Sequence, residues 1–405
     1  MEEVHRAIEV VARESYGRLI AYLSARTRDV AAAEDALSEA LLAALTTWAQ
    51  DGVPQQPEAW LLTTARRRLI DRARYARMQA ESALTLQLIS EQAEDPMPAE
   101  KFPDERLKLL FVCAHPAIDS DVHTALMLQT VLGLDAARVA RAFLISPATM
   151  GQRLVRAKAK IRDAGIAFAV PDEHELPQRL DAVLEAIYAA YGSGWEDAAG
   201  ADPRRRGLAD EAIWLARVLA QRMPEQPEAH GLLALILYCE ARRPARRAPD
   251  GRYVPLSEQD VRAWSVPMIA EAERELFAAA KQARPGRFQL EAAIQSVHAG
   301  RAHTGRTDWH AIALFYERLV HMAPMLGACI GHAVAVAEVN GPAEGLVLLD
   351  EIELKSVSTY QPYWAVRAHF LQQLGRAREA YDAFDRAIGL AEDDAVRQFL
   401  LQRRG

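Results

Sequence analysis

Apolar residues recur at helical spacing through residues 1–81 and predict a compact unit of three helices. One apolar series runs from Val10 to Leu23 and a second from Leu37 to Trp48, each repeating every three or four positions. Asp29 stands where its side chain can cap the second helix. Turn residues at 51–54 precede a third helix, which we expect to start at Pro57, because proline is favoured in a first turn.

The third helix, over 60–77, has an apolar side and an arginine side. Its apolar positions recur every four residues and can face a core; they are Leu61, Ala65, Leu69 and Ala73. Six arginines are offset by a single acid, Asp71. Arginine neutralises phosphate and an aromatic ring can stack on an unpaired base, so the exposed side predicts a contact with nucleic acid. The candidate residues are Trp60, Arg66, Arg67, Arg74, Tyr75 and Arg77. The alternative is a solvated face, the usual fate of charged helix surfaces.

Residues 82–104 lack helical periodicity. Five acids are interspersed there with three prolines, so an extended acidic linker is expected. A second small helical unit follows over 105–168.

Within that second unit, residues 132–162 have the proportions of a helix-turn-helix. We expect a short helix over 136–144, a turn at 145–147 and a basic helix over 148–163. The basic helix has a buried stripe of Met150, Leu154, Ala157 and Ile161. From Arg138 to Arg162 there are seven Lys or Arg and no acid, which favours DNA binding over a hairpin that binds nothing. The candidate DNA-binding residues are Arg138, Thr149, Gln152, Arg153, Arg156 and Lys160.

A short polar joint at 169–178 leads into residues 179–405, which we expect to be helical throughout. The segment from Tyr363 to Leu390 has the alternation of small and large residues that is typical of a tetratricopeptide repeat, and weaker echoes precede it. Because one such hairpin cannot bury its apolar face alone, several must stack into an α-solenoid with a concave surface. The predicted fold class is all-α, with two small helical domains followed by this tetratricopeptide-like extension.

Composition narrows the class of protein. A chain of 405 residues that is 50% hydrophobic and 25% charged has room for two or three ordinary domains. Neither a secretory signal pattern nor an apolar run long enough to span a bilayer is present, so we expect a cytoplasmic protein with no membrane contact. Three scattered cysteines favour reduced core positions over a disulfide framework or a metal site. No phosphate-binding loop or hydrolase motif is present, so neither an enzyme nor a cofactor is expected.

The order of these features resembles the extracytoplasmic-function class of bacterial RNA polymerase sigma factors. The run EDALSEAL at 34–41 is similar to that family's region 2 helix, 57–77 to its promoter-melting segment, and 132–162 to its region 4. The runs FVCAHPA at 111–117, ATMGQRLVRAK at 148–158 and AVAVAEVNGP at 333–342 resemble the subgroup with a long tetratricopeptide-like extension.

The resemblance implies specific partners: RNA polymerase core, through its beta-prime clamp and beta flap, and promoter DNA. Region 2 would melt and read the minus-ten element, and region 4 would read the minus-thirty-five element. The residues that it places against polymerase are Asp35, Leu37, Ser38, Glu39 and Leu41. The extension would regulate activity through an intramolecular contact or a protein partner, either by masking the DNA-facing sides or by supporting the bound form.

Two alternatives stay open at the level of sequence. A one-component helix-turn-helix regulator with a repeat-built sensor would bind duplex DNA without polymerase, and it would leave the arginine helix at 60–77 unexplained. A scaffold protein would leave all the basic faces solvated and would bind neither polymerase nor DNA.

Overall fold

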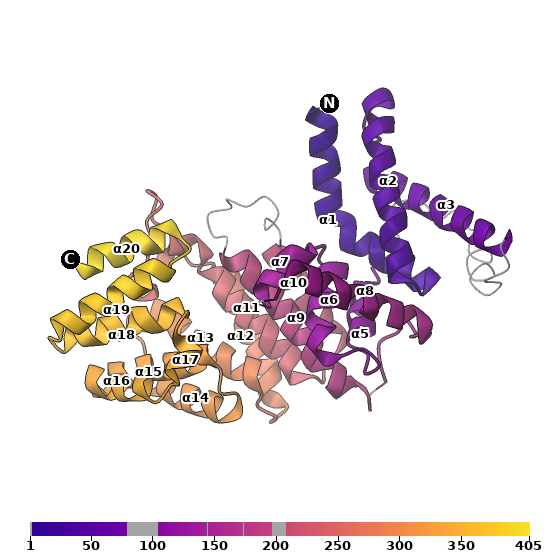
Figure 1. Cartoon of the computed structure of the whole chain (residues 1–405). Helices are drawn as coiled ribbons and strands as arrows, with labels where there is room; N and C mark the ends of the chain where they lie inside the picture. Colours follow the sequence, from indigo (N-terminus) through magenta and orange to yellow (C-terminus); the bar gives the residue numbers. More distant parts are fainter. Residues whose placement is uncertain (1, 79–103, 144, 173, 197–207) are drawn as a thin grey trace. The chain divides into compact units, whose positions relative to one another are not determined.

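The computed structural model describes residues 2–78, 104–143, 145–172, 174–196 and 208–405. Throughout these ranges the regular secondary structure is helical, apart from one isolated bridge between Arg247 and Tyr253, so the expected all-α class is confirmed. The chain divides into two compact units, unit 1 (Met1–Val218) and unit 2 (Leu219–Gly405). Figure 1 follows unit 1 from indigo through magenta, and unit 2 on to orange and yellow.

The first three helices form a small bundle inside unit 1. They are α1 (Glu2–Thr27), α2 (Val30–Asp51) and α3 (Pro57–Met78), and α2 packs against both of the others. The Asp29 side chain accepts a hydrogen bond of 3.0 Å from the backbone N–H of Ala32, which caps α2 as expected. Arg18 of α1 binds Glu58 in the first turn of α3, with 2.8 Å between Nε and Oε1. This ion pair fixes the start of α3 against α1.

Six more helices begin within unit 1: α5 (Arg106–Cys113), α6 (Ser120–Thr130), α7 (Ala136–Ala142), α8 (Pro147–Asp163), α9 (Leu176–Glu196) and α10 (Leu208–Arg222). Most residues of α5 and α6 are buried, and α9 packs on both helices. The extension that we expected from residue 179 therefore starts inside unit 1, because α9 covers the apolar side of α6. The expected linker at 82–104 lies outside the described residues, except for Asp104.

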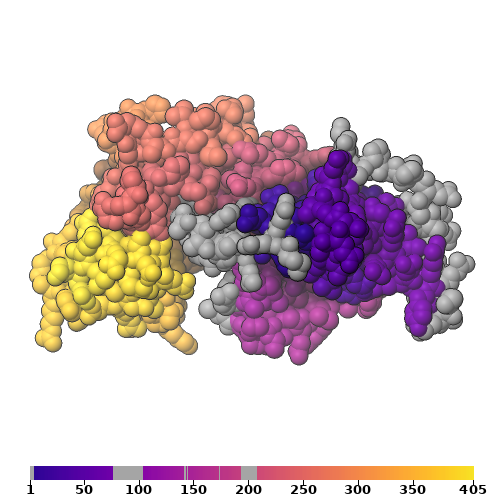
Figure 2. Space-filling view, turned by 90° about the horizontal axis from the view of Figure 1, so that it is seen from above, coloured from indigo at the N-terminus to yellow at the C-terminus, as the bar shows by residue number. Residues whose placement is uncertain are grey.

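α1 also packs directly on α5 and α6. Gly17 makes this approach possible, because a Cβ built there would lie only 1.8 Å from the carbonyl oxygen of Val131. In the space-filling view the violet helices α1–α3 lie over the magenta part of unit 1 (Figure 2). The first two helical units predicted from the sequence thus share one packed interior.

Unit 2 is built of consecutive helices that pack on their neighbours. They are α11 (Pro227–Ala241), α12 (Val266–Lys281), α13 (Arg287–Thr304), α14 (Trp309–Met322), α15 (Leu326–Asn340), α16 (Pro342–Asp350), α17 (Leu354–Val357), α18 (Gln361–Gln373), α19 (Ala377–Leu390) and α20 (Asp394–Arg404). Between α11 and α12 the chain forms a short 3-10 turn, Arg243–Arg246, and the bridge between Arg247 and Tyr253. Within unit 2, α13 packs on α14, α14 on α15, α15 on α16 and α18 on α19.

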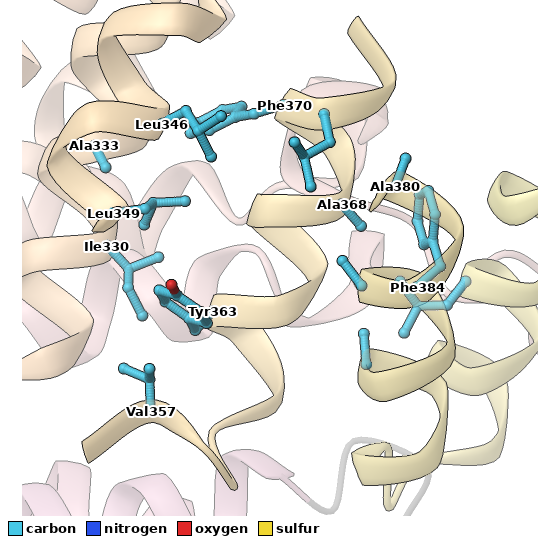
Figure 3. Close-up of a cluster of buried hydrophobic side chains, with 14 of the residues drawn as sticks. Ile330, Ala333, Leu346, Leu349, Val357, Tyr363, Ala368, Phe370, Ala380 and Phe384 are labelled. Carbon is cyan, nitrogen blue, oxygen red and sulfur yellow. The ribbon is translucent and has the colours of Figure 1, made fainter. Parts of the chain in front are cut away.

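The C-terminal helices share one apolar core. Ala368 and Leu371 of α18 and Ala380, Phe384 and Ala387 of α19 are buried in it. Gly375, with φ +73°, makes the turn between α18 and α19. Figure 3 shows Tyr363 close to Ile330 and Val357, and Phe370 beside Leu346, so α18 bridges α15, α16 and α17.

Cys113 is buried, and Cys239 and Cys329 are half-buried; all three are free thiols. Within the described residues, no helix combines the length and the apolar character that crossing a membrane requires.

Candidate nucleic-acid interface

The arginines of α3 divide between two directions. Arg72 turns toward α2, where it donates to Asp35 Oδ2 at 3.1 Å and to Glu39 Oε1 at 2.5 Å. Arg68 adds a longer ion pair, 3.6 Å from its Nε to Glu39 Oε2. These two arginines help to hold α3 on α2. Asp35 and Glu39, which we expected to bind polymerase, are the acids that form ion pairs with these arginines.

Arg67, Arg74 and Tyr75 form the outward part of α3. Both arginines are exposed, and neither makes an ion pair with any residue that the structure describes. The Tyr75 side chain is 61% exposed. Arg66 is half-buried, and the side chain of Arg77 lies outside the described residues. The exposed edge of α3 therefore combines two of the predicted arginines, Arg67 and Arg74, with an accessible ring.

Trp60 differs from Tyr75, although the sequence suggested the same role for both. It is half-buried, and its ring packs edge-on against buried Trp48 of α2, with 5.5 Å between the ring centroids. Such pairs stabilise a core beyond the area that they bury. Trp60 is therefore a packing residue of the α2–α3 contact, and the rings at the two ends of the arginine face lie in different environments.

The outward face of α2 carries Asp35 and Ser38, which are exposed, and Glu39, which is half-buried. Leu41 is half-buried as well. Leu37 is 1% exposed, so its expected part in the polymerase contact is corrected to a core position, because a buried side chain offers no surface to a partner. Sequence reasoning missed Leu42, which is 65% exposed. Its spacing of seven from Asp35 would have placed it on this face.

The basic helix α8 is formed as expected. The Ser146 hydroxyl caps it by accepting from the backbone N–H of Thr149 at 3.1 Å, and Pro147 occupies the first turn. The stripe of Met150, Leu154, Ala157 and Ile161 is buried, as predicted. On the opposite side, exposed residues share one face; they are Thr149, Gln152, Arg153, Arg156 and Lys160. Arg138, in α7, is half-buried.

One basic residue of α8 points inward instead. Lys158 donates to both carboxylate oxygens of Glu34 on α2, at 2.8 and 2.5 Å, and its side chain is only 8% exposed. Burial is the largest cause that raises the pKa of the Glu34 carboxyl above its ordinary value, while Lys158 acts to lower that pKa. Beside this pair, burial raises the pKa of the Cys113 thiol to about 12. On a helical wheel Lys158 lies at the edge of the apolar stripe, and this was the available signal for its burial.

One further contact joins α8 to the start of α2, and a separate one joins α5 to α10. Arg162 of α8 lies 4.0 Å from Asp29, the cap of α2. Arg106 binds Asp104 at 2.7 Å and Glu211 of α10, and its guanidinium stacks over the Trp214 ring at 4.0 Å. α8 is thus held on α2 by its inner side, while its outer polar face stays accessible. Unit 1 presents two separate exposed basic faces, one on α3 and one on α8.

Of the two exposed basic faces, the one on α3 lies in a segment that matches a described protein family. Residues 11–78 match the family described as Sigma-70 region 2, which covers α2, α3 and most of α1. Residues 179–280 match a family of unknown function, DUF6596. An uncharacterized protein of Rhizobium meliloti (strain 1021) is 39% identical over 385 residues, covering 93% of this chain and 89% of the relative. No solved structure matches the chain.

Proposed function

The chain belongs to the sigma-70 family, and from that premise we propose that it is an alternative sigma factor of the extracytoplasmic-function class. It directs RNA polymerase core to specific promoters. Region 2, made of α1–α3, opens and reads the minus-ten element, and α7 with α8 reads the minus-thirty-five element. The observation that carries the proposal is the exposed edge of α3, where Arg67, Arg74 and Tyr75 lie within the segment that matches region 2.

In this proposal α3 grips one separated DNA strand. Arg67 and Arg74 neutralise phosphates, which makes their share of the affinity sensitive to salt. Tyr75 provides a face for a base, and such stacking contributes roughly 1–3 kcal/mol per base. Arg66 and Arg77 belong to the same proposed contact. Trp60 contributes to this contact indirectly, because its ring packs against Trp48 and holds α3 on α2.

The polymerase contact is proposed for the outward face of α2. Asp35, Ser38 and Glu39 supply its polar part, and Leu41 with exposed Leu42 supplies its apolar part. An apolar side chain at the centre of a polar face is typical of protein interfaces. The partner is the beta-prime clamp of the polymerase, and the beta flap is the proposed partner of the domain that contains α8.

The outer face of α8 is proposed to read base edges. Gln152 and Arg153 are of the types that pair with adenine and guanine in the major groove, while Lys160, Arg156 and Arg138 meet phosphates. Thr149 stands at the start of this face, where its hydroxyl lies 2.8 Å from that of Ser146. Requiring two weak DNA contacts at a fixed spacing gives specificity that neither has alone.

The C-terminal extension is proposed to be a tetratricopeptide-like regulator that supports activity. Packing of α9 on α5 and α6 favours support over masking, because α9 completes the buried side of these helices and leaves the outer polar face of α8 exposed. A truncation after Val170, which removes α9 together with the rest of the extension, tests this role. We expect that truncated chain to lose promoter-dependent transcription; a gain would favour masking instead.

Run-off transcription with purified core polymerase tests the proposal as a whole. We expect a promoter-specific product from the wild-type chain, and none from the Arg67→Ala/Arg74→Ala variant, which should still bind core. The matched control is Arg6→Ala/Arg13→Ala, which removes the same charge from exposed positions of α1. Equal effects of the two double variants on transcription would contradict the proposed role of α3 in binding DNA.

One other outcome would reject the sigma function itself: the chain forms no complex with core and gives no specific product. A band shift on duplex DNA in the absence of polymerase would then favour a one-component regulator with a repeat-built sensor.

A further inference from the structure

Unit 2 contains a cavity of about 1000 Å³, at the upper end of the roughly 300–1000 Å³ range of small-ligand sites. Helices α13, α14, α15, α18 and α20 contribute to its wall, together with the segment at 255–258. Much of the wall is aromatic or aliphatic, including Trp309, Val334, Phe370 and Phe399. An apolar wall with a few fixed polar groups is typical of a pocket for a small molecule.

Arg301 of α13 gives the wall of this cavity a positive charge. Its guanidinium donates to the carbonyl oxygens of Ser257 at 3.1 Å and Gln259 at 3.0 Å, and it lies over the Trp264 ring at 5.1 Å. These neutral partners fix its orientation but leave its charge unbalanced, since no carboxylate in the described part of the chain pairs with it. Partial burial and the nearby Arg242 lower the pKa of Arg301.

The other charges of the wall add to this imbalance. Arg306, just after the end of α13, is exposed and forms no ion pair among the described residues. Arg403 is bound to Glu258 at 2.5 Å. Glu338 is the other acid of the wall, so three arginines face two glutamates in a chain whose net charge is −7. The cavity wall therefore carries a net positive charge in an acidic protein. The positive charges that no described carboxylate balances are those of Arg301 and Arg306.

His298 adds a neutral polar group rather than a further charge. Its ring packs edge-on against Trp309, with 5.5 Å between the centroids, and burial lowers its pKa to about 4. At neutral pH the imidazole is therefore uncharged and can donate or accept one hydrogen bond.

We propose that this cavity binds a small organic anion with an aromatic or branched aliphatic body. Arg301 and Arg306 receive the carboxylate, sulfonate or phosphate group, and the apolar wall around Trp309 and Phe370 encloses the body. A guanidinium fork matches such groups through paired hydrogen bonds.

Binding can be measured on the full-length chain without transcription, so the outcome is independent of the proposed sigma function. Two probes share one ring system. 8-Anilinonaphthalene-1-sulfonate carries an anionic group, and N-phenyl-1-naphthylamine does not. Fluorescence titration of the wild-type chain is expected to give one saturable site that prefers the sulfonate.

Arg301→Met tests the charge while keeping an apolar stem of similar length. The sulfonate should bind about 10- to 100-fold more weakly, since a charge-assisted hydrogen bond is lost, whereas the neutral probe should change little. Arg262→Met is the matched control: that side chain is 88% exposed and pairs with Asp260. Val334→Trp fills the cavity and should abolish binding of both probes.

Three results would overturn the proposal. The sulfonate could bind wild type and Arg301→Met equally, or Arg301→Met could weaken both probes equally, which would mean an apolar site or a damaged fold. Thirdly, Val334→Trp could fold, as judged by its circular dichroism melt, and still bind the sulfonate at full strength. If Val334→Trp does not fold, the contrast between Arg301→Met and Arg262→Met decides alone.

Discussion

The buried pair between Lys158 of α8 and Glu34 of α2 makes the sharpest prediction about how unit 1 holds together. The two side chains are 8% and 19% exposed, so neither charge has much water around it. Removing one partner of such a pair typically costs about 3–5 kcal/mol, because the other charge stays buried and uncompensated. Lys158→Met is the best perturbation, since methionine keeps the apolar stem and removes only the ammonium group.

The cost of Lys158→Met should depend on pH with a definite sign. Burial already raises the pKa of the Glu34 carboxyl above its ordinary value of 4.5, and Lys158 acts to lower it. Without Lys158 the folded-state pKa rises further. The folded state then holds a proton that the unfolded state releases, so stability falls as pH rises from about 4.5 through the folded-state pKa. Lys158→Met should therefore be tolerated better at acidic than at neutral pH.

Hydrogen exchange read by mass spectrometry can localise this effect to α8 and α2. A loss of about 3–5 kcal/mol corresponds to exchange that is roughly 10²- to 5 × 10³-fold faster for amides protected by this contact. Lys160→Met is the matched control, because Lys160 lies on the same helix and is exposed. Glu34→Leu/Lys158→Met should lose much less than the sum of the two single changes. Equal exchange in Lys158→Met and Lys160→Met would refute the reasoning.

Two other predictions concern packing and acid stability. Gly17→Ala should lower the stability of unit 1 by about 1–3 kcal/mol, because its Cβ meets a backbone carbonyl. Gly151→Ala, with nothing within 4 Å of its Cβ, should be neutral or gain about 0.5–1 kcal/mol; thermal melts of both variants check this pair, and equal shifts would contradict it. The lowered pKa of His298, about 4 against 6.5, means that unfolding takes up a proton in this window, so stability falls as pH drops from 6.5 to 4. His298→Gln should flatten that dependence by up to about 3 kcal/mol in urea midpoints collected against pH, and an unchanged slope would count against a buried neutral ring.

Helices and their buried faces could be predicted from the sequence because their causes are local. The stripe of α8 and the apolar face of α3 follow from spacings of three and four, and nearly every member of both is buried. The caps at Asp29 and Ser146 depend on residues only three positions away. The turn at Gly375 needs a left-handed backbone that glycine adopts without strain.

Contacts between distant segments could not be predicted in the same way. The spacing places Lys158 at the edge of an apolar stripe, yet nothing local identifies Glu34, 124 residues earlier, as its partner. The same limit applies to Trp60, whose ring could be expected at the DNA face until Trp48 is seen to pack against it. It applies also to Leu37 and Leu42, since both are leucines on one helix and only the packing of neighbouring helices separates core from surface.

Because the arginines of α3 point in two directions, only some of them contribute positive charge to the outward edge of the helix. The sequence counts six arginines against one acid, but Arg68 and Arg72 are already engaged with Asp35 and Glu39 of α2. The net positive charge of the outward edge is therefore smaller than the composition of the helix suggests, and Arg67 and Arg74 carry more of it.

The engagement of Asp35 and Glu39 is compatible with the proposed polymerase contact. A carboxylate accepts at about four positions, and these two side chains remain 66% and 40% exposed with Arg72 in place. A basic group of the polymerase can therefore add to Arg72 without displacing it, while Leu42 supplies the apolar contact that buried Leu37 does not. Binding at this face would then leave α3 held on α2, with its outward edge still turned toward DNA.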